Sequence, residues 1–214
     1  MPDPDLDPLL CTYVIEETPP SDEWYAFEEG VALAGVMGAQ WISEHVESPT
    51  EELNEWLSQG YRKHLRRAKT KDFDKLVDEV PGLILEGSYG RLFASVLHRK
   101  STAPKTLNRL QLSGFKVSER RAKLPAAPLE IMVNESLSMS FGKAAVAAAH
   151  AAQNIFLKYH SEPTPSFDNW INHGFSATAS QGLVEPSSVQ YAQVEDFGLT
   201  EVPAGSITAL AQLR

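Results

Sequence analysis

Cysteine, long apolar runs and metal-binding spacings are almost missing from this 214-residue chain. The single cysteine, Cys11, cannot form an internal disulfide, and no CxxC or HExxH spacing predicts a metal site. No stretch of about 18 apolar residues is present, which excludes a membrane-spanning helix. The acidic, proline-containing start is the opposite of a signal peptide. We therefore expect a reduced, cytoplasmic protein with no metal, no cofactor and no membrane partner.

Positive charge is missing from one end of the chain, because residues 1–61 contain no Lys or Arg. The formal net charge of −9 argues, taken alone, against unspecific binding of nucleic acid. The positive charge is concentrated in the middle of the chain, over residues 62–75 and 100–123. These two clusters are either solvated surfaces or a surface that contacts phosphates.

Two distant segments repeat the same order of features. Residues 31–42 and 144–155 are both alanine-rich, as in helices that pack closely against their neighbours. Each is followed by a polar, proline-containing loop and then by a Trp-(Leu/Ile)-x-x-Gly-aromatic motif, at residues 56–61 and 170–175. Alanine-rich helices resemble each other easily by chance, but the matched Trp and Gly positions make chance a poorer explanation. We therefore predict an internal duplication.

Short segments rich in β-forming residues precede both helices, at residues 10–15 and 129–133. Strands that alternate with helices predict an α/β fold, with a small mixed β-sheet flanked by helices and two similar units in tandem. We expect a first unit over residues 1–99, a basic connecting segment over 100–126 and a second unit over 127–214. Further strands are expected at 61–68, 84–87, 92–97, 175–179, 191–195 and 207–213, with short helices at 72–77 and 106–112.

Lys143 stands in the first turn of the second alanine-rich helix, directly after Gly142. The helix dipole disfavours a cation at this end, so the side chain is expected to face a ligand or a carboxylate, unless it is an ordinary exposed lysine. His150 follows about two turns later on nearly the same face. It is either an auxiliary proton carrier or a neutral histidine packed against the helix.

A second group of polar side chains follows the strand predicted at 191–195. Asp196, a glycine turn and Thr200 stand in sequence there, where they can aim a carboxylate and a hydroxyl at one point. Loops at strand ends commonly carry the sites of α/β proteins. The alternative is a turn in which Asp196 only binds its own backbone.

These segments together resemble the type-2 peptidyl-tRNA hydrolases, which are typical of archaea and eukaryotes. The resemblance covers about Leu129 to Leu213. It implies hydrolysis of the ester between a peptide and the 3′ end of tRNA, a reaction of translation. It also implies peptidyl-tRNA as partner and Lys143, Asp196 and Thr200 as catalytic residues. The matching features are Met139 to Lys143, His150-Ala151, Trp170-x-x-x-Gly174, and Asp196-x-Gly198-x-Thr200-Glu201-Val202-Pro203-x-Gly205-Ser206-x-Thr208.

Two positions depart from the family pattern. Ala147 and Ala149 stand where the family usually has Gln and often has Ser. The leading hypothesis is an active hydrolase, and the alternative is a catalytically weak or inactive homologue that binds tRNA or a protein. A third alternative is a dimer module that only reuses the fold.

The first half resembles a diverged copy of the second. It keeps Trp56-x-x-x-Gly60 followed by a lysine, as in the family, but it has no match to Lys143 or to the Asp-x-Gly-x-Thr motif. We expect the first half to bind tRNA phosphates while the second half carries the ester site. Two fused units imitate a dimer, so a monomer with pseudo-dimeric units or a homodimer is expected. The predicted phosphate ligands are Arg62, Lys63, Arg66 and Arg67.

Overall fold

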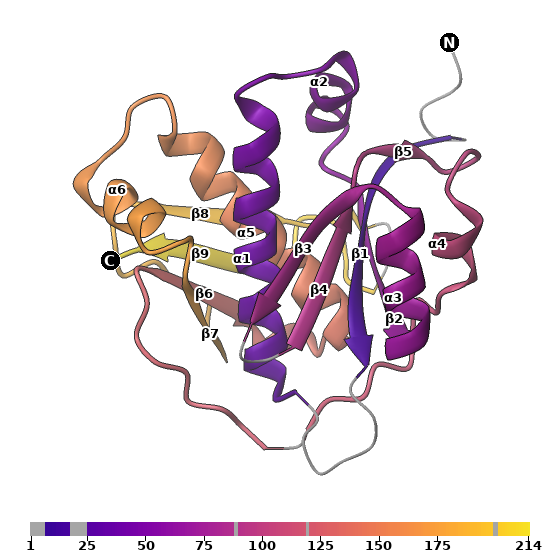
Figure 1. Ribbon diagram of the computed structural model, residues 1–214. Coiled ribbons are helices and arrows are strands. Elements are labelled where there is room, and N and C mark those ends of the chain that lie inside the picture. Colours follow the sequence, from indigo (N-terminus) through magenta and orange to yellow (C-terminus); the bar gives the residue numbers. More distant parts are fainter. Residues whose placement is uncertain (1–6, 18–24, 88–89, 119, 199–200) are drawn as a thin grey trace. The chain divides into compact units, whose positions relative to one another are not determined.

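Two small mixed β-sheets flanked by helices make up the computed structural model of the protein (Figure 1). The structure describes residues 7–17, 25–87, 90–118, 120–198 and 201–214. The predicted fold class is confirmed, since both halves are mixed α/β units of similar build. Over these residues, no helix combines the length and the apolar character needed to cross a membrane.

The first sheet has the strand order β2-β1-β4-β3, and β5 pairs with β1. Strands β1 and β2 are parallel, and two helices make the connection between them. Strand β4 is antiparallel to both β1 and β3. The elements are β1 (Leu9–Glu17), α1 (Phe27–Val46), α2 (Glu51–Ser58), β2 (Lys63–Lys69), α3 (Thr70–Glu79), β3 (Gly82–Gly87), β4 (Gly90–Ser95), β5 (His98–Arg99) and α4 (Lys105–Arg109).

The second sheet repeats this arrangement with the order β7-β6-β9-β8. Strands β6 and β7 are parallel, two helices again connect them, and β9 is antiparallel to both β6 and β8. The elements are β6 (Leu129–Asn134), the 3₁₀ turn η1 (Glu135–Leu137), α5 (Phe141–Tyr159), α6 (Pro165–Asn172), β7 (Ala177–Gly182), β8 (Tyr191–Glu195) and β9 (Ile207–Leu213).

The two sheets match strand by strand, which agrees with the internal duplication predicted from the sequence. The conserved order in each half is a strand, two helices, a parallel strand and an antiparallel pair. The matched tryptophans, Trp56 and Trp170, lie in α2 and α6 and are fully buried. The halves differ after the second strand, where the first has α3 and the second has the loop 183–190.

The compact units of the protein do not follow the order of the sequence. One unit consists of Met1–Trp24 and Glu44–Lys116, and the other of Tyr25–Ser43 and Val117–Arg214. We refer to them as the first and the second unit. Most of α1, which precedes β2 in the chain, therefore belongs to the second unit. The sequence predicted repeat units at 1–99 and 127–214 with a connecting segment at 100–126. These bounds describe the sequence repeats and stay a prediction.

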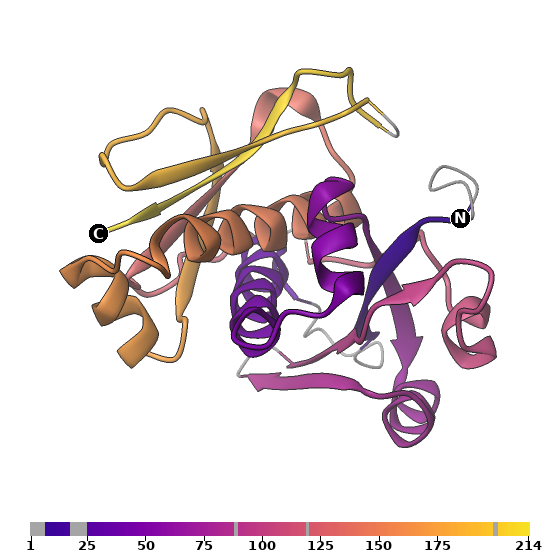
Figure 2. The same cartoon turned by 90° about the horizontal axis from the view of Figure 1, so that it is seen from above.

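Helix α1 lies beside α5 in the second unit (Figures 1 and 2). The backbones approach closely, because a Cβ atom added to Gly38 would lie 2.5 Å from the carbonyl oxygen of Ala149. A Cβ atom at Gly35 would meet the side chain of Ile131, which stands on β6. The alanines and glycines that suggested close packing in the sequence thus permit this contact.

The core of the first unit lies where α3 covers the sheet. Phe73 and Leu76 of α3 are fully buried and share one apolar cluster with Val14 and Phe93 of the sheet. Leu107 of α4 joins the same cluster. The apolar face of the short helix predicted at 72–77 therefore packs against the sheet.

The helix predicted over 106–112 is shorter than expected. Helix α4 ends before Leu110, whose backbone is extended with φ −73° and ψ 151°. The chain that follows lies along the edge of β2, where the N–H of Arg67 donates to the carbonyl of Gln111 at 2.9 Å. The guanidinium of Arg66 also donates to the carbonyl of Leu110 at 2.7 Å. These contacts compete with the helix and end it.

Candidate active site

The Lys143 ammonium donates a hydrogen bond to Oδ2 of Asp196 in the second unit. Lys143 lies in the first turn of α5, and Asp196 directly follows β8. Both side chains are largely buried, with 16% and 13% of their surfaces exposed. The carboxylate offsets the unfavourable placement of a cation at the helix N-terminus. Two of the three predicted catalytic groups therefore meet, while Thr200 lies outside the described residues.

The loop after β8 holds Asp196 through its backbone. The N–H of Asp196 donates to the carbonyl of Ser206 at 2.9 Å, and its own carbonyl accepts from the N–H of Gly205 at 2.8 Å. Its Oδ1 accepts from the N–H of Gly198 at 2.8 Å, so the turn that the sequence allowed as an alternative is also formed. Gly198 has φ +75°, and a Cβ atom there would lie 2.7 Å from the nitrogen of Ala204. A glycine is required at this position.

Ser140 and Glu201 form a second contact between the same two segments. The hydroxyl of Ser140 donates to Oε1 of Glu201 at 2.6 Å, and its N–H donates to Oε2 at 2.8 Å. The same hydroxyl accepts from the N–H of Lys143 and so caps α5. Neither residue is among the predicted site residues, although a serine before a helix is a recognised capping signal.

His150 lies on α5 and is partly exposed. At a rise of about 1.5 Å per residue, it stands about 10 Å along the helix from Lys143. Its role as an auxiliary proton carrier stays a prediction. Ala147 and Ala149 are both buried. The backbone of Ala149 faces Gly38 of α1, so this part of α5 serves helix packing.

Lys63 on β2 points into the first unit, away from any phosphate in solvent. Its ammonium donates to the carbonyl of Tyr61 at 3.0 Å and lies 5.0 Å from the ring centre of Trp56. Burial lowers the pKa of Lys63 to about 7, although the nearby thiol of Cys11 opposes this shift. The aromatic rings stabilise the charged form in part.

The three arginines predicted as phosphate ligands occupy different environments. Arg66 is half-buried and donates to the carbonyls of Leu110 and Asn108. Arg67 forms an ion pair with Glu17 at 2.6 Å and also donates to Gln111. Arg62 is partly exposed. The structure therefore does not gather these four cations on one surface.

The Lys143–Asp196 pair has the components of a hydrolytic site. A carboxylate held by two hydrogen bonds can orient a water molecule and accept its proton. An ammonium close to it can stabilise a developing oxyanion. Within the described ranges, no group of three or more His, Cys, Asp or Glu side chains is placed to hold a metal ion.

Part of the chain is similar to known proteins. Residues 128–212 match the family Peptidyl-tRNA hydrolase PTH2. A peptidyl-tRNA hydrolase from Thermococcus sibiricus is 33% identical over 92 residues, which cover 38% of this chain and 78% of that protein. A peptidyl-tRNA hydrolase from Thermococcus onnurineus gives the same values. No solved structure matches the chain significantly.

Proposed function

This chain belongs to the peptidyl-tRNA hydrolase PTH2 family, and we propose that its second unit cleaves the ester bond between a peptide and the 3′ end of tRNA. The observation that carries the proposal is the hydrogen bond between Lys143 and Asp196. Both residues lie inside the segment that matches the family, and they come from distant parts of it. The reaction belongs to translation, so we propose that the protein acts in the cytoplasm.

In the proposed mechanism, Asp196 orients a water molecule and accepts its proton as the water adds to the ester carbonyl. Lys143 stabilises the negative charge on the carbonyl oxygen of the tetrahedral intermediate. The bond to the ribose oxygen then breaks, and that oxygen takes the proton. The products are a free peptide and tRNA. Thr200 is proposed to bind the water through its hydroxyl.

A second candidate function follows from Ala147 and Ala149. Two polar groups usual in the family are replaced by methyl groups at these positions. Loss of one hydrogen-bonding group from such a site costs a factor of about 10² to 10³ in rate. A homologue that binds tRNA or a protein with little or no hydrolysis is therefore the alternative.

We also propose that the first unit contributes to tRNA binding. The proposed phosphate ligands remain Arg62, Lys63, Arg66 and Arg67, although Lys63, Arg66 and Arg67 already donate to protein groups. The chain is proposed to work either as a monomer, in which two similar units take the place of two subunits, or as a homodimer. Light scattering distinguishes these two states.

The test is release of labelled peptide from N-acylated aminoacyl-tRNA. The variants Lys143→Ala and Asp196→Ala are expected to lose at least about 10²-fold in kcat. Lys123→Ala, which removes an exposed cation from the second unit, is the control and should match the wild type. A wild-type rate no higher than that of the two site variants would exclude the hydrolase and favour the binding alternative.

A further inference from the structure

Strand β7 leaves one side of its backbone open in the second unit. It forms one end of the strand order β7-β6-β9-β8, and in the part of the chain that the structure describes it pairs with β6 alone (Figure 1). The N–H and C=O groups on its outer side are therefore available to another extended chain. A Cβ atom added to Gly182, the last residue of β7, would meet nothing within 4 Å, so the space beside the end of the strand is open.

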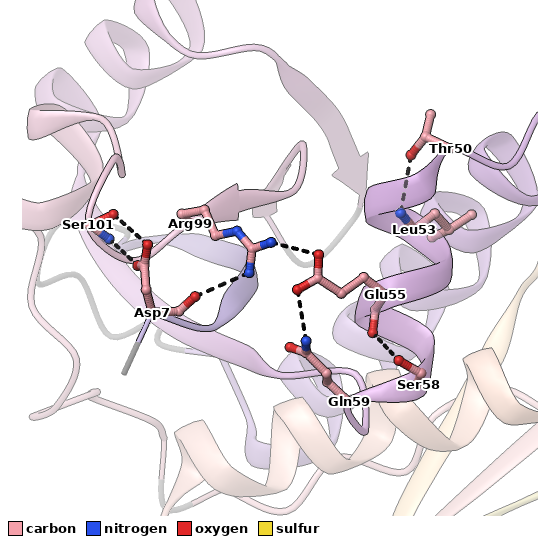
Figure 3. A network of polar contacts seen from close by, with 8 residues as sticks. All are labelled: Asp7, Thr50, Leu53, Glu55, Ser58, Gln59, Arg99 and Ser101. Carbon is pink, nitrogen blue, oxygen red and sulfur yellow. Dashed lines mark hydrogen bonds and ion pairs between the residues drawn. The ribbon is translucent and has the colours of Figure 1, made fainter. Parts of the chain in front are cut away.

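Three other strand edges in the described residues carry features that discourage pairing. Strand β3 has the charge of Glu86, and β8 has Glu195 beside a shift of register after Val194. Strand β5 has only two residues and is fixed by a polar network, in which Arg99 forms an ion pair with Glu55 at 2.6 Å (Figure 3). By contrast, β7 has the sequence ATASQG, with no charge, no proline and a continuous register with β6.

In the first unit, the edge that corresponds to β7 is covered by an extended segment. Strand β2 occupies this position, because Lys63 pairs with β1 as Ala177 pairs with β6, each at the same distance from the matched tryptophan. The N–H of Arg67 donates to the carbonyl of Gln111 at 2.9 Å, so the chain after α4 lies along β2 in an antiparallel bridge. This edge of the repeated fold therefore accepts an extended chain.

The same correspondence identifies which backbone groups of β7 point outward. Arg67, whose N–H points away from β1, corresponds in register to Gln181 of β7. Alternate residues of a strand direct their backbone groups to the same side, so Ala179 and Ala177 share the direction of Gln181. The N–H and C=O groups of these three residues are the ones that an added strand would meet.

The open edge leads toward the Lys143–Asp196 pair. Strands β6, β7 and β8 run in one direction, because β9 is antiparallel to both β6 and β8 while β6 and β7 are parallel. Their C-terminal ends therefore lie at one end of the sheet. Lys143 follows β6 through η1, which contacts β7, and Asp196 directly follows β8. A substrate held at this pair can extend one of its ends along β7.

We infer that the outer edge of β7 binds the peptide part of peptidyl-tRNA as an added strand. The inference rests on the proposed function, because the ester held at Lys143 and Asp196 attaches the C-terminal residue of that peptide. The peptide therefore has its C-terminus at the C-terminal end of β7 and runs parallel to it. Peptides attached to tRNA differ in their side chains but share a backbone, and strand addition recognises the backbone. The small, uncharged side chains of β7 suit peptides of many sequences.

The separation between the ester site and the edge sets a minimum peptide length. A chain added outside β7 lies four strand spacings from β8, which is about 19 Å at about 4.8 Å per spacing. An extended peptide advances about 3.4 Å per residue, so about six residues connect the ester to the edge. Residues beyond these pair with Ala177, Ala179 and Gln181. Shorter peptides reach the ester site without using the edge.

The test compares two peptide lengths with the full-length protein. For tRNA that carries about twelve residues, the wild-type kcat/KM should exceed that for N-acetylaminoacyl-tRNA at least about tenfold, because each backbone hydrogen bond adds a factor of about two to ten. Gln181→Pro removes an outward N–H from an edge strand, where proline is tolerated, and should reduce this ratio to about two or less. Gln181→Ala keeps the N–H and should keep the wild-type ratio. Equal ratios in all three proteins would overturn the inference.

A change in the peptide itself guards against a folding defect in Gln181→Pro. Methyl groups on the peptide nitrogens beyond about the sixth residue from the ester remove the donors for β7, and should lower the wild-type ratio to about two or less. An undiminished ratio with the methylated substrate would refute strand addition. If light scattering shows instead that Gln181→Pro turns a dimer into a monomer, while the ratio stays unchanged, a second copy of the chain occupies the edge and the inference is wrong.

Binding of an uncleavable substrate separates this inference from the hydrolase proposal. The same peptides are joined to tRNA through an amide in place of the ester. The Kd of the longer analogue should be at least about tenfold lower than that of the one-residue analogue, and Gln181→Pro should remove this difference. That result, together with no ester hydrolysis by the wild type, would support the edge site and reject the hydrolase. Equal Kd values together with rapid ester hydrolysis would reject the edge site alone.

Discussion

The carboxylate of Glu201 accepts hydrogen bonds from both the backbone N–H and the hydroxyl of Ser140. These two residues are 61 positions apart. One belongs to the loop that carries Asp196, and the other caps the helix that carries Lys143. The contact therefore holds the start of the helix that carries Lys143 against the loop that carries Asp196.

Removal of this contact should slow hydrolysis without abolishing substrate binding. For Glu201→Ala we expect kcat to fall about tenfold or more with a small change in KM, because small displacements of reacting groups are costly. Glu201→Gln should recover part of the rate, since its amide oxygen still accepts one hydrogen bond. Steady-state kinetics with Glu162→Ala, at an exposed position, is the comparison. An unchanged kcat in Glu201→Ala would mean that the contact does not position the site.

The close packing of α1 on α5 predicts an unequal response of two glycines. Gly38→Ala places a methyl group 2.5 Å from the Ala149 oxygen and should lower the free energy of unfolding by about 1–3 kcal/mol. Gly182→Ala on β7 meets no atom within 4 Å and should have little effect. Urea denaturation of both variants measures the difference. Similar midpoints would contradict the close approach of the helices.

The buried ammonium of Lys63 should make stability depend on pH. Its pKa falls from 10.5 to about 7 in the folded protein, so between these values the unfolded chain binds more protons. The cost of the buried charge is full below pH 7 and disappears as pH rises toward 10.5. Lys63→Met should therefore unfold at higher urea than the wild type at pH 7.

The gain from Lys63→Met should shrink by up to about 1.4 kcal/mol for each pH unit above 7. The difference between the two proteins, measured from pH 7 to 8.5, isolates this group. Cys11 and Tyr61, whose pKa values burial raises, titrate in both proteins. A difference that stays constant with pH would show that Lys63 remains charged in the folded state.

The ion pair of Glu16 with Arg91 should stabilise the first unit at neutral pH and lose this effect in acid. Arg91 binds Glu16 at 2.6 Å, and this hydrogen bond lowers the pKa of Glu16 from 4.5 despite the opposing effect of burial. A carboxyl whose pKa is depressed on folding stabilises the protein above 4.5 and loses that effect as pH falls further. Arg91→Gln should therefore weaken the fold at pH 7 and flatten its acid dependence. Unfolding curves from pH 7 to 3, with Arg109→Gln as an exposed control, measure this. An acid dependence of Arg91→Gln as steep as that of the wild type would count against the pair.

Much of the fold was predictable because its signals are local. The strand expected at 207–213 is observed as β9, and the alanine-rich segments lie within α1 and α5. The strands expected at 84–87 and 92–97 are observed as β3 and β4. The membership of α1 in the second unit was not predictable, because alanine and glycine show that a helix packs closely without showing against what.

The candidate site was predictable in part for the same reason. Asp196 is marked by its position after a strand, and Lys143 by an unfavourable helix position, and the two do meet. The Ser140–Glu201 contact was missed because it depends on two segments meeting in space. The charge run at 62–67 marked a basic strand, but it did not reveal that alternate residues face opposite sides of the sheet.

Helix α1 gives the protein an interleaved construction. The segment 25–43 is encoded among the elements of one repeat and completes the other. An excised fragment of residues 127–214 would therefore expose the flank of α5 on which Gly35 and Gly38 rest. The boundary between the sequence repeats therefore differs from the boundary between the compact units, and a fragment cut at the repeat boundary would lack a helix that packs on it.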